Sequence, residues 1–257
     1  MCADVTSLPV QPQKHDLRFY GRRKSKPLTA KIESLYNLHW PYYALTIAQM
    51  RTVKSLTAFF PPAIDSAKAY RAVFLEVGCG AGEHIHFQAR QHPDHDYIAV
   101  EPFLNGRARL LADAVRESMK NLRIADEDIR ALLPLFPDTS LDGVYILYPD
   151  PWPKLRHVKR RLIQGIFLQI LAQKMKAGAP LYIATDDPGY QQWIWRACQD
   201  SPYFETISGC CEDYTQPYDS WISTRYEKKA LQEGRQPLYF IWKRTKVLTN
   251  SGDPVCL

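Results

Sequence analysis

Short apolar runs alternate with helix-length stretches from residue 72 onward, and this alternation constrains the fold more than any other feature of the sequence. Such alternation is typical of strand–helix–strand units around a parallel sheet. The predicted strands are residues 72–77, 97–100, 122–125, 144–148, 181–184, 204–207 and 238–242. The predicted helices are residues 83–92, 105–119, 160–175 and 188–199. We therefore expect an α/β fold with a doubly wound, seven-stranded, mostly parallel sheet.

The chain before this alternation is predicted to be an N-terminal extension. Residues 1–28 carry prolines and the basic cluster 22–26 without apolar periodicity, so we expect a flexible basic arm. Two roles stay open for this arm: a solubilising tail, or an electrostatic segment that orders on nucleic acid. Residues 29–70 mix aromatic and helix-compatible stretches interrupted at Pro41, and we expect them to form a helical extension packed on the sheet. Residues 29–257 then make up a single domain.

Composition limits the partners and the compartment. The chain has 33 basic and 27 acidic residues, a net charge of +6, which favours an anionic partner. Its six cysteines form no C-x-x-C pair and have no zinc-site spacing, so we expect reduced thiols and no metal site. No signal peptide and no apolar run long enough to cross a bilayer is present in the sequence. We expect a soluble, cytoplasmic protein without a membrane segment.

Glycines follow the first predicted strand, at positions 78, 80 and 82. Glycines between a strand and a helix let the backbone approach a ligand closely, so Gly78 and Gly80 are predicted to contact a nucleotide-like cofactor. The spacing is G-x-G-x-G, whereas a dinucleotide fingerprint is G-x-G-x-x-G, and the third glycine position is taken by Glu83. Because this carboxylate would repel a pyrophosphate, we expect a cofactor without phosphate and disfavour an NAD-linked dehydrogenase.

Carboxylates stand where the predicted strands end. Glu101 ends the second strand, where it can accept hydrogen bonds from ribose hydroxyls. Asp128 follows the third strand and can contact an adenine amino group, while Asp126 is more simply a turn residue. With Glu76 and Asp150, four acids surround one cleft and suit a cationic cofactor. The glycine loop and these acids resemble class I S-adenosylmethionine-dependent methyltransferases, which implies a Rossmann-like fold and S-adenosylmethionine as cofactor.

The fourth strand leads into Tyr-Pro-Asp-Pro-Trp-Pro-Lys at residues 148–154. Prolines on both sides restrict Asp150 to one pose, and Trp152 offers a flat face on which a base can stack. Residues 154–161 contain five Lys or Arg and no acid, which is typical of a phosphate-binding face. We expect this basic block to begin the following helix, where backbone N–H groups also favour anions. A rigid loop beside a solvated basic face is the alternative interpretation.

Four motifs resemble those of the bacterial tRNA (guanine-N7)-methyltransferases in their order and spacing. They are the 148–154 motif, Arg-His-Val-Lys-Arg-Arg at 156–161, Ala-Thr-Asp at 184–186 and Thr-Arg-Tyr-Glu at 224–227. The resemblance runs from about Phe19 to Arg244. It implies methyl transfer from S-adenosylmethionine to N7 of a guanosine in the variable loop of tRNA, giving 7-methylguanosine. It implies no obligatory protein partner and leaves open whether the chain is a monomer or a homodimer.

The resemblance also implies a role for each matching residue. Asp150 is the expected catalytic residue. Together, Glu76, Glu101, Asp128 and Asp150 are expected to surround the methyl donor. The expected tRNA contacts are Lys154, Asp186, Thr224, Arg225, Tyr226 and Glu227, and the expected phosphate contacts are Arg156, Lys159, Arg160 and Arg161. Thr224 and Glu227 also have capping-box spacing, so a helix N-cap is an open alternative. The chain departs from many relatives at Val158, where they have His, and at Asp187, where they have Trp.

The chemistry of guanine N7 agrees with these residues. N7 has a free lone pair and no proton to remove, so its methylation needs no general base. It needs alignment with the donor and stabilisation of the positive charge that develops on the purine. We expect Asp150 to orient the guanine through its N1 and amino edge and to counter this charge, with Asp186 assisting. Two alternatives are a class I methyltransferase for a small molecule or protein, which leaves the basic block unexplained, and a non-catalytic RNA-binding module, which predicts a damaged donor site.

Overall fold

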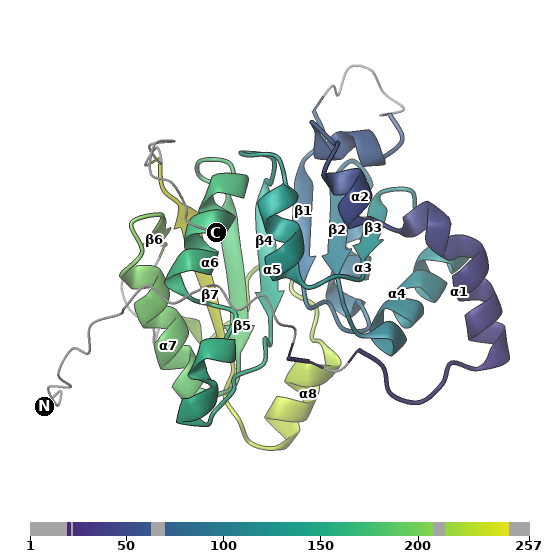
Figure 1. Ribbon diagram of the computed structural model, residues 1–257. Coiled ribbons are helices and arrows are strands. Elements are labelled where there is room, and N and C mark those ends of the chain that lie inside the picture. The colour runs from purple at the N-terminus through teal and green to yellow at the C-terminus, as the bar shows by residue number, and fades with distance from the viewer. Residues whose placement is uncertain (1–19, 22, 63–69, 208–213, 247–257) are drawn as a thin grey trace, which may run out of the picture.

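A seven-stranded sheet in the order β3-β2-β1-β4-β5-β7-β6 forms the centre of the molecule (Figure 1). The computed structural model describes residues 20–21, 23–62, 70–207 and 214–246. The strands are β1 (Val73–Val77), β2 (Asp96–Val100), β3 (Leu122–Ala125), β4 (Gly143–Leu147), β5 (Pro180–Thr185), β6 (Phe204–Thr206) and β7 (Leu238–Arg244). The first five strands are parallel, and β7 runs antiparallel to β5 and β6. The predicted seven-stranded, mostly parallel sheet is confirmed.

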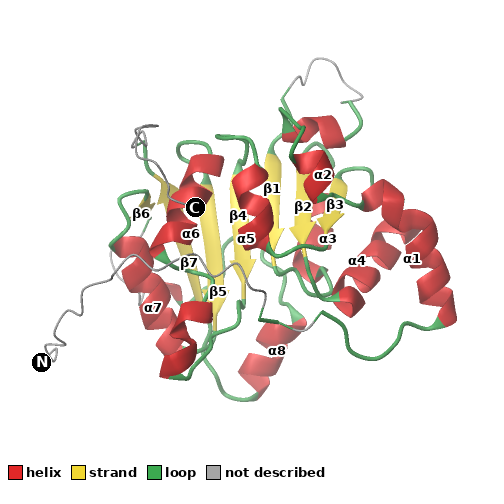
Figure 2. Ribbon diagram, viewed as in Figure 1, coloured by secondary structure: helices red, strands yellow, loops and turns green. Residues whose placement is uncertain are grey.

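Helices cover both faces of the sheet (Figure 2). Helices α2 (Ile47–Met50), α5 (Ile129–Leu132), α6 (Gly165–Lys174) and α7 (Pro188–Gln199) share one core with the sheet. Helices α3 (Glu83–Gln91) and α4 (Leu104–Arg116) cover the other face, and α1 (Ala30–Tyr43) packs on α4. Short 3-10 helices are η1 (Leu56–Phe59), η2 (Leu133–Leu135) and η3 (Leu155–Arg160). No helix in the described ranges is both long and apolar enough to cross a bilayer.

The strands are buried on both faces because helices cover both sides of the sheet. Alternate residues of each strand point to opposite sides and so enter different cores. Val144 and Ile146 of β4 belong to the core shared with α6 and α7. Tyr145 and Leu147 point to the other side, into a separate aromatic cluster. Side chains from residues 214–224, which we call the aromatic segment, pack over this cluster. Helix α8 (Arg225–Gln232) follows the aromatic segment and lies at the carboxyl end of the parallel strands (Figure 1).

Two helix predictions were wrong in their boundaries. The basic block does not begin α6, because residues 155–160 form the separate helix η3 and Arg161 leaves the helical conformation, with ψ of 138°. The Gln164 side-chain amide donates to the carbonyls of Lys159 and Arg161, at 2.9 and 2.7 Å, which ends η3 without continuing the helix. Helix α1 is not broken at Pro41 but runs on to Tyr43. The missing N–H of this proline removes a single backbone hydrogen bond in the last turn.

Residues 23–26 of the N-terminal arm lie along the start of α4. The Leu104 N–H donates to the Arg23 carbonyl at 2.8 Å, and the Asn105 side-chain amide donates to the Lys26 carbonyl at 2.9 Å. The Ser25 N–H donates to the Asn105 side-chain oxygen at 3.0 Å. Residues 1–19 and 22 lie outside the described residues. The role of the arm and the boundaries of the single domain stay predictions.

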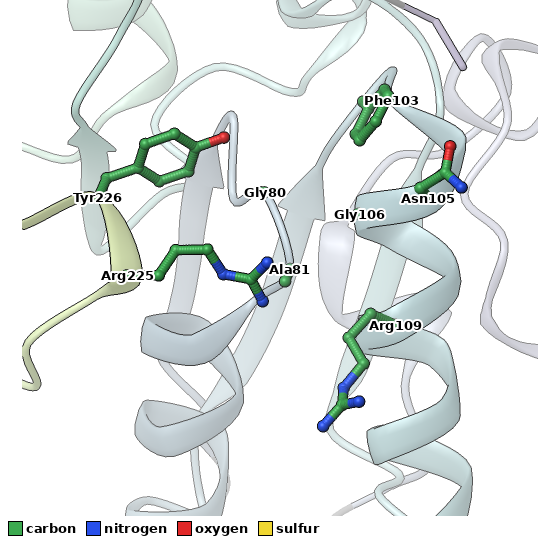
Figure 3. A pocket seen from close by; sticks show the side chains of 8 residues that line it. All are labelled: Gly80, Ala81, Phe103, Asn105, Gly106, Arg109, Arg225 and Tyr226. Atoms are coloured by element: carbon green, nitrogen blue, oxygen red, sulfur yellow. The ribbon is translucent and has the colours of Figure 1, made fainter. Parts of the chain in front are cut away.

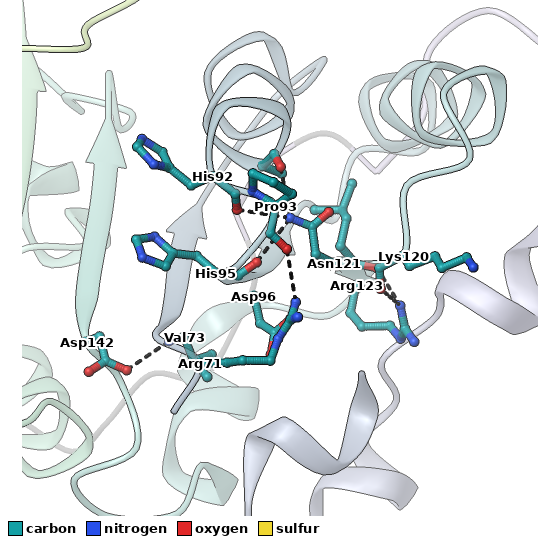
Figure 4. Close-up of polar contacts among 12 residues, drawn as sticks. Arg71, Val73, His92, Pro93, His95, Asp96, Lys120, Asn121, Arg123 and Asp142 are labelled. Atoms are coloured by element: carbon teal, nitrogen blue, oxygen red, sulfur yellow. Dashed lines mark hydrogen bonds and ion pairs between the residues drawn. The ribbon is translucent and has the colours of Figure 1, made fainter. Parts of the chain in front are cut away.

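Polar contacts at the amino ends of β1, β2 and β3 hold this end of the sheet together (Figure 4). The Asn121 side-chain amide donates to the carbonyls of Ala89, His92 and His95, at 2.8 to 3.3 Å. The Arg71 guanidinium pairs with the fully buried Asp96 carboxylate through two nitrogens. These groups are satisfied by one another, so the amino end serves stability. Ligands of such open sheets bind at the opposite, carboxyl end.

Candidate active site

The glycine loop after β1 forms one wall of the candidate site. Gly78 has φ of 71°, a left-handed conformation, and a Cβ added there would have no atom within 4 Å. The backbone at this position therefore faces open space that a ligand can fill. On the other side of the loop, a Cβ on Gly106 of α4 would lie 2.4 Å from the Gly80 carbonyl oxygen. The absence of a side chain at Gly106 lets α4 pack directly on the loop.

Glu101, at the end of β2, holds the glycine loop in place. Its carboxylate accepts hydrogen bonds from the Gly80 N–H at 2.6 Å and from the Phe103 N–H at 2.8 Å. Burial raises the pKa of Glu101, the two backbone hydrogen bonds lower it, and the nearby charge of Asp150 raises it further. The charge of Asp150 thus contributes to the raised pKa of Glu101, whereas loss of water is the cause of the raised pKa of Asp150.

Glu76 and Asp128 both have partners within the protein. One oxygen of the buried Glu76 carboxylate lies 2.6 Å from Nδ1 of His84, and no hydrogen bond of the other oxygen is seen among the described residues, so that oxygen is available to a ligand. Asp128 is the N-cap of α5, and it accepts from the Arg130 N–H at 2.8 Å and pairs with the Arg130 guanidinium at 3.1 Å. The expected contact of Asp128 with adenine competes with this cap and stays a prediction.

The loop around Asp150 has an unusual backbone. Tyr148 and Trp152 have φ of 53° and 43°, which non-glycine residues rarely adopt. Such conformations cost on the order of 1–3 kcal/mol and persist at functional sites where the surrounding structure holds them. Here the Arg161 guanidinium donates to the Pro151 carbonyl at 2.8 Å, and the Arg160 guanidinium lies 5.0 Å from the Trp152 ring centroid. Asp150 is presented between these two strained residues.

Asp150 is exposed as a whole residue, but neighbouring residues partly desolvate its carboxylate. This loss of water raises the pKa of Asp150. Burial raises the pKa of Tyr226, and the charges of Glu101 and Asp150 raise it further. The Tyr226 ring packs against Gly80, and the Gly80 N–H donates to the Glu101 carboxylate, so Tyr226 and Glu101 both contact the glycine loop.

Helix α8 contacts the glycine-loop region at its start, and the residues that follow it contact the loop after β5. Its first residue, Arg225, pairs with Glu83 of α3 at 2.6 Å. The Tyr226 ring lies 3.4 Å from the position of a Cβ on Gly80. A cavity of about 250 Å³ opens here (Figure 3), lined by Gly80, Ala81, Phe103, Asn105, Gly106, Arg109, Arg225 and Tyr226. Beyond the other end of α8, Arg235 pairs with Asp186.

The other two residues of the 224–227 motif hold α8 in place. Thr224 is the N-cap of α8 and accepts a hydrogen bond from the Glu227 N–H at 3.3 Å, as the capping alternative predicted. The Glu227 carboxylate does not reach back to the cap; it is buried and accepts from Trp221 Nε1 at 2.8 Å and from the Tyr239 hydroxyl. Of the four residues of this motif, the exposed Arg225 and Tyr226 are therefore better placed for direct tRNA contact than the buried Thr224 and Glu227.

The basic block divides into exposed and internal cations. Lys154, Arg156 and Lys159 are exposed, as a phosphate-binding face requires. Arg161 is buried, and its guanidinium lies 5.2 Å from the Tyr190 ring centroid and 5.1 Å from that of Trp193. This buried side chain supports the Asp150 loop from inside, which disfavours the expected phosphate contact of Arg161; that contact stays a prediction. Arg160 is half-buried, with its guanidinium over Trp152 and 4.5 Å from the Tyr20 ring centroid.

Sequence reasoning missed His84 and Arg235, which pair with two of the predicted site residues. His84 is one residue beyond Glu83 at the start of α3, and Arg235 follows α8. Neither belongs to a motif with a known spacing, so only their positions in the fold connect them with the site. In the described residues, no group of three or more His, Cys, Asp or Glu side chains could hold a metal ion.

The sheet order with its antiparallel β7, the glycine loop after β1 and the acids at the ends of β1, β2 and β4 define a class I methyltransferase. Residues 70–239 match a family model described as "Putative methyltransferase". The tRNA (guanine-N(7)-)-methyltransferase of Chelativorans sp. is 38% identical over 239 residues, covering 91% of this chain and 97% of that protein. The tRNA (guanine-N(7)-)-methyltransferase of Rhodospirillum rubrum is 37% identical, covering 92% of this chain and 91% of that protein. The chain belongs to the tRNA (guanine-N(7)-)-methyltransferase family.

Proposed function

We propose that this chain transfers a methyl group from S-adenosylmethionine to N7 of a guanosine in tRNA, giving 7-methylguanosine. The observation that carries this proposal is the glycine loop, held by Glu101 and packed against Tyr226, together with the strained Asp150 loop and the exposed cations that follow it, in a member of this family. A tRNA substrate also agrees with the cytoplasmic location expected from the sequence.

The residues around the glycine loop fit this methyl donor. The open space beside Gly78 leaves room for a ligand against the backbone. The free oxygen of Glu76 and the carboxylate of Glu101 would hold the amino and ribose groups, and their negative charge suits a cationic ligand without phosphate. When bound, the donor supplies an electrophilic methyl group on a sulfonium sulfur.

Asp150 and Asp186 would orient the guanine. Carboxylates accept hydrogen bonds only, so they match the N1–H and amino groups on the edge of guanine. N7 keeps its lone pair for the methyl group and loses no proton, and the positive charge passes from sulfur to the purine. The negative charge of Asp150 stabilises that purine charge. Asp186 is paired with Arg235 in the free protein, so guanine binding would exchange this ion pair for hydrogen bonds to the base.

The exposed cations Lys154, Arg156 and Lys159 would bind tRNA phosphates next to the Asp150 loop. Trp152 is half-buried and its ring contacts Tyr20 edge-on, so it also contributes to the entrance of the site. Arg225 and Tyr226 of α8 line the cavity beside the glycine loop and would contact the tRNA there.

The proposal is tested by incubating the protein with methyl-labelled S-adenosylmethionine and bulk tRNA, followed by nucleoside digestion and chromatography. We expect label in 7-methylguanosine, and its loss in the Asp150→Ala variant. The control variant is Asp200→Ala, which removes an exposed carboxylate at the end of α7, away from the site. Label in another nucleoside would contradict the guanine N7 assignment, and no label in RNA would point to a small-molecule or protein acceptor.

A further inference from the structure

His84 is a fully buried histidine that the proposed chemistry does not use. It lies in the first turn of α3 with 1% of its surface exposed. Its ring nitrogen Nδ1 is 2.6 Å from the Glu76 carboxylate, and Nε2 is 2.6 Å from the Tyr218 hydroxyl. Both nitrogens of this side chain are therefore engaged: Nδ1 with the donor side of the site, and Nε2 with the aromatic segment and, at 3.3 Å, with the Gln88 amide nitrogen of the same helix.

The chemistry of the two partners assigns the protons in this chain. The Glu76 carboxylate accepts, so Nδ1 is the donor in that hydrogen bond. In the neutral ring Nε2 then accepts from the Tyr218 hydroxyl, which is the tautomer that satisfies all three groups. One turn further along α3, the Gln88 amide donates to the Ser220 carbonyl at 2.9 Å. Helix α3 therefore holds the aromatic segment at two points.

The aromatic segment leads directly to the proposed tRNA contacts. The Tyr218 ring packs edge-on against Trp221, with ring centroids 5.2 Å apart. The Trp221 indole donates to the buried Glu227 carboxylate of α8 at 2.8 Å. A continuous set of contacts thus runs from Glu76 through His84, Tyr218 and Trp221 to α8.

We propose that His84 is a positioning residue that couples occupancy of the donor site to the placement of α8 for tRNA. This inference rests on the proposed function. A ligand on the free oxygen of Glu76 changes the strength and direction of the hydrogen bond from His84, and the ring transmits this change to Tyr218. Because binding free energies are reciprocal, tRNA must then strengthen donor binding by the same factor by which the donor strengthens tRNA binding.

The decisive measurement is the affinity of S-adenosylhomocysteine with and without saturating tRNA, by titration calorimetry. In the wild-type protein we expect tRNA to tighten this binding several-fold, within the range of about 5- to 150-fold that is typical of such coupling. Tyr218→Phe removes only the hydroxyl, so we expect this factor to fall to about one while thermal stability and the affinity for S-adenosylhomocysteine alone change little.

Tyr182→Phe is the matched control. Tyr182 belongs to the same aromatic cluster, with its ring centroid 4.5 Å from that of Tyr218, and no hydrogen bond of its hydroxyl is seen among the described residues. We expect wild-type coupling in this variant. Equal coupling in Tyr218→Phe and Tyr182→Phe, or no coupling in the wild-type protein, would overturn the inference.

Two substitutions at His84 separate its two hydrogen bonds. Asparagine places an amide near the position of Nδ1 and glutamine places one near Nε2. We expect His84→Asn to keep the affinity for S-adenosylhomocysteine alone and to lose the coupling. His84→Gln should lower that affinity, because Glu76 loses its partner. Formation of 7-methylguanosine by the wild-type protein is measured separately. If the wild-type protein methylates tRNA but Tyr218→Phe does not change the coupling, this inference is rejected and the proposed function is unaffected.

Discussion

Nε of Arg225 lies 2.6 Å from Oε1 of Glu83, and this ion pair joins the first residue of α8 to the first residue of α3. Beyond the other end of α8, Arg235 pairs with Asp186 after β5. The two ion pairs connect the helix to the donor side and to the proposed guanine side of the carboxyl edge. The placement of α8 therefore determines the geometry of both halves of the site.

Glu83→Gln tests whether the ion pair or a direct RNA contact explains Arg225. The pair is partly exposed, so its loss should change the free energy of unfolding by less than about 1 kcal/mol. If the pair docks α8, the KM for tRNA rises by about three- to fivefold in initial-rate measurements, since about 1 kcal/mol corresponds to this factor. If Arg225 serves only as an RNA cation, Glu83→Gln leaves KM unchanged or lowers it. Lys229→Ala, which removes a partner of Glu233 in the same helix, is the control.

Salt dependence distinguishes the exposed cations from the internal one. Arg156→Met removes an exposed charge, so the slope of log Kd for tRNA against log salt should decrease by about 0.7 to 0.9. Arg161→Met should leave the slope unchanged, because the Arg161 guanidinium lies inside the protein. Filter-binding titrations at several salt concentrations provide the comparison, and equal slopes in the two variants would contradict the assignment.

Arg161→Met should instead destabilise the protein. The substitution removes the hydrogen bond to the Pro151 carbonyl and the contacts with the Tyr190 and Trp193 rings. We expect a loss of about 1–3 kcal/mol in the free energy of unfolding, measured by urea denaturation. Arg156→Met should lose less than about 0.5 kcal/mol, as is usual for exposed positions. A stability equal to that of Arg156→Met would show that the internal contacts contribute little.

The pH dependence of methyl transfer should show a raised acid limb. The proposed role of Asp150 requires its charged form, and the pKa of this residue is raised above the ordinary value of 3.8 by loss of water. Activity is then fully present well above the raised pKa and falls as the pH decreases through it, so kcat/KM begins to fall at a higher pH than an unperturbed Asp would cause. Glu101, whose pKa is also raised, contributes to the same limb. Thermal unfolding over the same pH range separates this effect from acid denaturation.

Gly106→Ala tests the contact of α4 with the glycine loop. The added Cβ would lie 2.4 Å from the Gly80 carbonyl oxygen, so the helix must move away. We expect a destabilisation of about 1–3 kcal/mol, together with weaker binding of S-adenosylhomocysteine. Gly165→Ala is the matched control, because a Cβ there meets no atom within 4 Å and Ala favours the helix more than Gly. The two variants are compared by thermal unfolding and calorimetry.

Much of the fold followed from local patterns. The strand at residues 122–125 and the helix at 188–199 were predicted with their observed ends, because apolar runs bounded by polar residues and Pro188 at the helix start are local signals. The separate helix η3 could not be foreseen in this way. Where it ends, the Gln164 amide donates to two backbone carbonyls, and the direction of that side chain is not encoded in any spacing.

The sequence by itself determined the class of fold, the positions of the acids at the strand ends and the resemblance to the family. These depend on periodicity and on motif order, which are properties of the chain alone. Only the tertiary structure decided that Arg161 points inward, that Glu227 is on the buried face of α8 and that His84 joins Glu76 to Tyr218. The physical reason is that burial and hydrogen bonding depend on neighbours from distant segments, and His84 and Tyr218 meet across 134 positions of the chain.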